Sequence, residues 1–219
     1  MQRTIQSIAF LMLLVTFSSS SFSQASHFSI SVNSLTTNFN YGSSNKMLRA
    51  DKKDYKGWQA GFSYQAGITK HFSVVPELYF AVKGGRLEST NAISSAGSTL
   101  RVSSIDLPVL ARLHLGRLYL NGGAYASYLV GGRMKLKGSQ SAPASSSKIS
   151  FDHLPGGFHR WDAGWQAGAG YNFGMKKGLM TLDVRYGYGL VNISRDVERY
   201  NRTLNISLVV SKHSRKKSI

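Results

Sequence analysis

Eight separate stretches of this sequence alternate between large apolar residues and small or polar ones. In one of them, Trp58, Phe62 and Ile68 share a parity, while Gln59 and Ser63 share the other. Because successive side chains of a β-strand point to opposite faces, a period of two predicts strands and not helices. The expected strands cover 27–38, 57–68, 72–87, 100–114, 118–136, 161–173, 180–193 and 200–210.

The connections between these expected strands differ in length in a regular way. Three are short turns, at Thr69-Lys70-His71, at Gly116-Arg117 and from Gly174 to Gly178. The other four are polar and mostly longer, at 39–56, 88–99, 137–160 and 194–199. An even number of strands with short turns on one side and long loops on the other is typical of outer-membrane barrels. The sequence therefore predicts an all-β fold, an eight-stranded antiparallel up-and-down transmembrane β-barrel over 24–211, with both termini periplasmic.

The N-terminal 23 residues have the pattern of a secretory signal peptide. A basic start at Arg3 precedes the apolar run 8–17 and a small, polar segment at 18–23. This run is too short to span a bilayer as a helix, so we expect cleavage before Gln24. No later segment carries 18 consecutive apolar residues, which leaves an exported soluble protein or a barrel. Residues 212–219 are predicted to form a basic periplasmic tail.

Two observations favour a membrane barrel over a soluble periplasmic β-barrel binding protein. Glycines and opposite charges on the polar faces suit the narrow interior of an eight-stranded barrel. Aromatic residues also gather at both ends of the expected strands, as a bilayer interface favours. They are Trp58, Trp161 and Tyr200 on the long-loop side and Phe72, Tyr171 and Phe173 near the short turns. We further expect bulges at Pro76, at Pro108 and near Ser103-Ser104, where the alternation slips.

Five stretches carry a family pattern: PELYFAVKGG (76–85), SSIDLPVLARL (103–113), LYLNGGAYASYLVGG (118–132), DAGWQAGAGYNF (162–173) and LDVRYGYGLVNI (182–193). In these stretches the chain resembles the PorT-like family of outer-membrane β-barrel proteins of Gram-negative bacteria. The resemblance implies an eight-stranded barrel in the outer membrane. It supplies no catalytic residue to carry over.

Six charged residues are expected to face the lumen and to form a structural network. They are Glu77, Asp106, Arg112, Asp162, Asp183 and Arg185. An unpaired buried ion is costly, so we expect these side chains to pair with one another and close the lumen. A proton or ion path is the alternative, which a filled eight-stranded lumen disfavours. The sequence therefore predicts no open pore.

The formal net charge of the chain is +17. In the expected topology, many of its basic side chains lie at the outer ends of the strands. Phosphorylated lipopolysaccharide lies at this level of the membrane, and basic side chains bind phosphate. The candidate contacts are Lys52, Lys53, Arg133, Lys135, Arg160 and Arg199. A merely solvated charged surface is the alternative. Nucleic acid is an unexpected partner for an exported protein, despite the strong positive charge.

His153 and His159, with Asp152 and Asp162, lie in or beside the third long loop. A histidine near a carboxylate can act as a general base or hold a metal. No nucleophile stands at an informative spacing, so we predict no enzyme activity, cofactor or metal site; a rim enzyme acting on lipid or peptide remains the alternative. The expected role is structural or interactive, with surface loops contacting lipopolysaccharide, an envelope protein or a ligand.

The pentapeptide GWQAG occurs twice, at 57–61 and 164–168. Both copies are expected to begin strands that descend from the long-loop side. Trp58 and Trp165 would then face lipid, and Gln59 and Gln166 the lumen. A duplicated four-strand half and a shared local constraint both account for the repeat.

Overall fold

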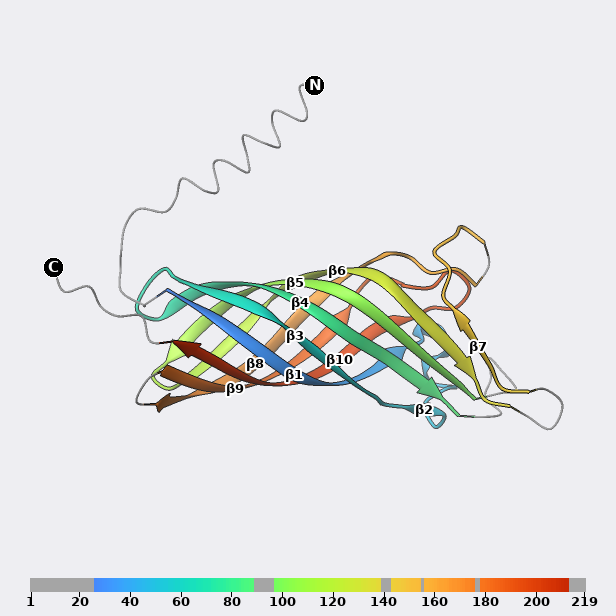
Figure 1. Cartoon of the computed structure of the whole chain (residues 1–219), viewed down its shortest axis with the longest axis horizontal. Helices are drawn as coiled ribbons and strands as arrows, with labels where there is room; N and C mark the ends of the chain where they lie inside the picture. Colours follow the sequence, from blue (N-terminus) through green and yellow to red (C-terminus); the bar gives the residue numbers. More distant parts are fainter. Residues whose placement is uncertain (1–25, 89–96, 139–142, 155, 176–177, 213–219) are drawn as a thin grey trace, which may run out of the picture.

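The computed structural model describes residues 26–88, 97–138, 143–154, 156–175 and 178–212, and in it eight long strands slant around one barrel (Figure 1). Each strand pairs with the next in antiparallel fashion, and the barrel closes because β10 pairs with β1 as well as with β9. The eight strands are β1 (His27–Asn40), β3 (Tyr55–Gly67), β4 (Phe72–Leu87), β5 (Ser98–Leu115), β6 (Leu118–Leu136), β8 (Trp161–Met175), β9 (Gly178–Gly189) and β10 (Tyr200–Lys212). The predicted fold class is confirmed.

Three short elements lie at the end of the barrel opposite the start of β1 and the end of β10 (Figure 1). They are the 3₁₀ helix η1 (Gly42–Asn45), β2 (Lys52–Lys53), which pairs with β4, and β7 (Ser145–Lys148), which pairs with β6. We call this end the loop end and the other the turn end. Within the described ranges, no helix is long and apolar enough to span a bilayer. The predicted signal peptide and residues 213–219 of the predicted tail lie outside the described residues.

The outer surface of the barrel is apolar and its interior is polar. Along β5, the outward side chains from Ile105 to Leu115 are apolar and exposed, and all but Ala111 are large, whereas Asp106 and Arg112 between them are buried. These ten steps cover about 33 Å at ~3.3 Å per residue. With strands tilted by roughly 40°, they form an apolar band about 25 Å tall, the height that a bilayer requires. A soluble barrel would have a polar outer surface and an apolar interior. The observed arrangement therefore excludes the soluble periplasmic barrel.

Two predictions about strand regularity are wrong. The register is the same on both sides of Pro76, since Ser63 lies opposite Glu77 and Ala66 opposite Val74. The β5–β6 pairing also runs through Pro108 without a shift. Each proline therefore removes a donor without adding a residue to the strand. In addition, β9 ends at Gly189, so the expected strand at 180–193 is too long.

The predicted bulge near Ser103-Ser104 is confirmed, but the additional residue is on the neighbouring strand. Ser104 pairs with Leu129 and Ser103 with Gly131, which leaves Val130 of β6 without an opposite residue. Before Val130 the odd-numbered residues of β6 face the lumen. Beyond it the parity is inverted, so that Arg133 is exposed and Met134 packs inward. Without the bulge, strict alternation along β6 would put Arg133 on the lumenal face, whereas with it Arg133 lies on the outer surface.

An apolar cluster lies at the loop end of the barrel. Its buried members are Phe39, Tyr41, Leu48, Leu87, Leu100, Val102, Leu129, Phe158 and Ile193. They come from the ends of four strands and from three loops, and we call them the apolar cap. The cap was not predicted, because its loop residues have no periodic pattern. It supports the view that the loop end is sealed.

The two GWQAG copies have the same backbone geometry. A Cβ added to Gly57 or Gly61 would lie 2.0 Å from a carbonyl oxygen of β4, and one added to Gly164 or Gly168 would lie 2.1 or 2.2 Å from a carbonyl oxygen of β9. Because real Cβ atoms do not come this close to oxygen, both copies need glycine for the approach of the next strand. Trp58 and Trp165 are exposed on the outer surface, as predicted.

Candidate functional site

The lumen holds a network of buried charges centred on Arg185 of β9. Arg185 Nη1 donates to Glu77 Oε2 at 2.6 Å, and its Nε lies 2.5 Å from Asp183 Oδ1. The second contact is an ion pair by distance, although its angle does not suit a hydrogen bond. Tyr119 and Asn121 both donate to the other oxygen of Asp183. Two carboxylates therefore share one guanidinium, and neutral donors support them.

A second network lies further toward the loop end, where Lys83 of β4 reaches Asp106 of β5. Lys83 Nζ lies 2.9 Å and 3.0 Å from the two oxygens of Asp106, which also accepts from Ser104 and Ser127. The side-chain set predicted from the sequence did not include Lys83. Its parity indicated the lumen, but parity does not identify the counter-ion of a given carboxylate.

Two of the predicted network members make no ion pair within the described residues. Asp162 accepts from Tyr125 at 3.1 Å and from Asn201 at 2.8 Å, both neutral. Arg112 donates to the neutral oxygen of Gln65 at 3.0 Å and lies 4.1 Å from the ring centroid of Tyr119. Within the predicted set, Glu77 and Asp183 thus pair with Arg185, Asp106 pairs with Lys83 outside the set, and these two make no ion pair among the described residues.

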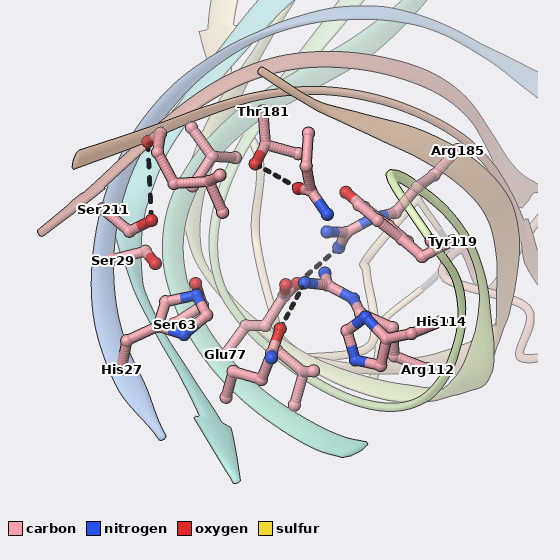
Figure 2. Close-up of a pocket in the computed structure, with 16 residues that line it drawn as sticks. His27, Ser29, Ser63, Glu77, Arg112, His114, Tyr119, Thr181, Arg185 and Ser211 are labelled. Atoms are coloured by element: carbon pink, nitrogen blue, oxygen red, sulfur yellow. Dashed lines mark hydrogen bonds and ion pairs between the residues drawn. The ribbon is translucent and has the colours of Figure 1, made fainter. Parts of the chain in front are cut away.

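A cavity of about 120 Å³ lies in the lumen at the turn end, with Arg112 and His114 among its lining residues (Figure 2). Glu77 and Arg185 form part of its lining, and Figure 2 shows their side chains and that of Arg112 pointing toward the centre of the barrel. His114 Nε2 is 2.9 Å from Ser73 Oγ. The cavity is thus polar and carries both signs of charge.

The outer surface of the loop end carries a groove lined by basic residues, and we call it the basic groove. Its volume is about 570 Å³. It is lined by Tyr55, Arg86, Thr99, Arg101, Arg133, Lys135 and Lys137. Arg101 of β5 lies directly opposite Arg133 of β6, and Arg133 lies opposite Lys148 of β7. Like charges in opposite positions of a sheet repel one another, so this arrangement favours an anion between them.

The six predicted phosphate contacts differ in their exposure and in their partners. Arg133 and Lys135 line the basic groove, and Arg160 is exposed beside Phe151, at 4.0 Å from its ring centroid. Lys53 pairs with Glu88 at 3.7 Å, and Lys52 is half-buried with its Nζ 2.6 Å from Asn45 Oδ1.

Arg199 is 7% exposed and donates to Ser194 at 2.6 Å, so its assignment as a surface phosphate contact is wrong. Arg199 also lies over Phe158 of the apolar cap, at 5.7 Å from its ring centroid. Arg86 and Arg101, which complete the basic groove, were missed. Their spacing across β4 and β5 becomes visible only with the strand register.

The structure gives contacts for two of the loop residues considered as catalytic candidates, Asp152 and His159. Asp152 accepts from Ser150 Oγ at 2.6 Å, and His153 is exposed. The backbone N–H of His159 donates to Ile193. Asp162 is inside the barrel, away from these loop residues, among Tyr125 and Asn201. Among the described residues, no three His, Asp or Glu side chains form a cluster that could hold a metal.

A closed barrel of eight strands with an apolar belt outside and bonded charges inside defines a transmembrane β-barrel. The chain belongs to the family described as outer membrane protein β-barrel domain, whose model matches residues 22–195. It is therefore an outer-membrane barrel protein. No curated protein matches the chain significantly in sequence.

Several solved barrels are similar to this chain at 10% identity. One is Ail, the attachment invasion locus protein of Yersinia pestis, solved in complex with the heparin analogue sucrose octasulfate. The match covers 85% of this chain and 99% of the Ail chain, with a TM-score of 0.42. The match with Neisserial surface protein A covers 85% of this chain and 99% of that protein, with a TM-score of 0.45. The match with OprG from Pseudomonas aeruginosa covers 86% of this chain and 97% of OprG, with a TM-score of 0.37.

Proposed function

We propose that this outer-membrane barrel has a structural or interaction role, without catalysis and without an open pore, and that its basic groove binds phosphate groups of lipopolysaccharide. The observation that carries the proposal is the lining of the groove, which contains four cations from three strands, Lys137 just after β6, and no carboxylate. A cation-only groove in which Arg101 lies opposite Arg133 is stabilised when a phosphate lies between them.

The depth of the groove supports a lipid headgroup as the source of the phosphate. On β5 the exposed apolar residues end at Ile105, and Ser103 and Arg101 follow on the same face. Arg101 therefore lies just beyond the apolar band, where headgroups meet the hydrocarbon. This proposal includes the orientation expected from the sequence, with the loop end outside a Gram-negative cell and both termini in the periplasm.

Membership of the PorT-like group within the outer-membrane barrels belongs to the same proposal and rests on the five matching stretches. The polar loops and the apolar cap beneath them support a role in which preformed loops meet an envelope protein or a ligand. Neither partner is needed for the phosphate contact at the barrel surface.

Lipid binding by charge variants of the folded barrel tests the groove. The double variant Arg101→Gln, Arg133→Gln should weaken binding of lipopolysaccharide by about tenfold or more, whereas Arg117→Gln in the β5–β6 turn should not. Lipid A lacking its phosphates should bind wild type and the double variant equally. Equal binding of intact lipopolysaccharide by both proteins would refute the proposed contact.

The rim-enzyme alternative has a separate test. Cells that produce wild type or the triple variant Asp152→Asn, His153→Ala, His159→Ala should show identical lipid A species and identical envelope protein profiles. A lipid or peptide product that disappears with the triple variant would replace the proposed non-catalytic role with an enzymatic one.

A further inference from the structure

The cavity at the turn end contains a buried cation without an ionic partner. Arg112 is 9% exposed, and among the described residues its side chain makes one hydrogen bond, to the neutral Gln65. Its Nε is buried and has no acceptor. A guanidinium that is removed from water without a counter-ion is unfavourable, so its surroundings favour an anion.

Among Arg112, Glu77 and Arg185 of the cavity lining, Arg112 lies nearest the turn end. Arg112 lies opposite Ser73, the second residue of β4, whereas Glu77 lies four residues further into the same strand. Glu77 and Asp183 already share Arg185. An anion that enters from the turn end therefore meets Arg112 before it meets the two carboxylates, which limit how deep it can go.

We infer that the turn-end cavity is a binding site for a small free oxyanion, of the phosphate or carboxylate class, held by the guanidinium of Arg112 with His114 beside it. The volume of about 120 Å³ accommodates such a group, since one water needs roughly 10–15 Å³ on the same scale. Thr181, Asn172 and Ser211 add neutral hydrogen-bonding groups to the lining. The cavity opens inside the ring of strands and not toward lipid, so the ligand is a free ion and not a lipid headgroup (Figure 2).

This site is independent of the basic groove, which lies on the outside of the opposite end. Inorganic phosphate could bind both, so the experiment needs a readout that is specific for each place. We would titrate inorganic phosphate, and in a second series acetate, into the barrel folded in micelles. The amide NMR signals of His114, Gly116 and Thr181 report on the cavity, and those of Arg101 and Lys135 report on the groove.

The expected result is a saturable shift of the three cavity signals with at least one of the two anions. Arg112→Gln should weaken this local affinity by about tenfold, the factor expected for one charge-assisted hydrogen bond, while Arg101→Gln should leave it unchanged. Cavity signals that do not shift in wild type, or that shift equally in Arg112→Gln, would overturn the inference. If Arg112→Gln does not fold, Arg112→Lys takes its place, and the wild-type titration alone can still refute the site.

Discussion

Arg185 and Glu77 are joined by a 2.6 Å hydrogen-bonded ion pair although 108 residues separate them in the chain. Their strands, β9 and β4, lie on opposite sides of the barrel, since three strands separate them in either direction around the ring. The pair therefore spans the lumen and ties two distant parts of the barrel together.

Removal of either partner from this pair should destabilise the barrel to different extents. Arg185→Met leaves both Glu77 and Asp183 without their cation, whereas Glu77→Gln leaves Arg185 paired with Asp183. We expect a loss of about 3–5 kcal/mol in unfolding free energy for Arg185→Met and a smaller loss for Glu77→Gln. Urea unfolding of the folded barrel measures both. The reverse order would contradict the network described here.

The repeated glycines should be intolerant of a methyl group in both copies. Gly61→Ala and Gly168→Ala each place a Cβ within about 2 Å of a carbonyl oxygen of the next strand. We expect each to lose about 1–3 kcal/mol, because the backbones must separate. Gly174→Ala is the matched control, since its Cβ would meet nothing within 4 Å. If only one copy is sensitive, a common steric cause for the repeat is wrong.

Thiol labelling can test whether the outward and inward positions of β6 are exchanged beyond Val130. The chain has no cysteine, so each introduced thiol reports without background. Arg133→Cys and Lys135→Cys should react rapidly with a charged, water-soluble reagent, whereas Met134→Cys should react slowly because Met134 packs against the apolar cap. Rapid reaction at Met134→Cys with protection at the other two positions would mean that β6 runs without the bulge.

Acid should loosen the contact between the first and last loops of the loop end. The backbone and hydroxyl hydrogen bonds from Ser43 hold the pKa of Glu198 below its ordinary 4.5. Burial raises the pKa of Asp196, but the Ser194 hydrogen bond and the charge of Arg199 outweigh it, and the pKa is lowered. A carboxylate with a depressed folded pKa stabilises the fold above the ordinary value and loses this contribution as the pH falls through the folded one.

The amide signal of Ser43 should therefore be constant above pH 4.5 and should change below it. Glu198→Gln should remove this change, and Asp54→Asn is a matched control in the same part of the barrel. A Ser43 signal that titrates identically in Glu198→Gln would show that another group is responsible.

Alternation along each strand was sufficient to predict the side of the barrel for most residues. Trp58, Glu77 and Asp183 lie where their parity indicates, because a strand in a closed barrel must expose one face to lipid and the other to the lumen. The short turns and the class of fold followed from the same pattern, whereas the end of β9 at Gly189 did not. Alternation alone does not place residues where the backbone departs from a simple strand, such as Arg133 beyond the bulge, and the surface position expected for Arg199 in a loop is wrong.

Partner identity within the lumen could not be predicted from the pattern. Asp106 pairs with Lys83 on the neighbouring strand, whereas Glu77 pairs across the lumen. Both choices depend on strand register and on side-chain reach, and neither is visible in a period of two. The apolar cap was missed for a related reason, because its members become neighbours only after the loops fold over the barrel end.

The unpaired residue Val130 determines which sequence changes in β6 preserve the basic groove. Substituting Arg133 or Lys135 removes one charge, but deleting a single residue from β6 near Val130 would exchange the outward and inward positions of the whole outer part of the strand. Met134 would then face outward, and two cations would enter the apolar cap. Strand length near this position is therefore under stricter constraint than residue identity, and insertions or deletions there should be rarer than substitutions.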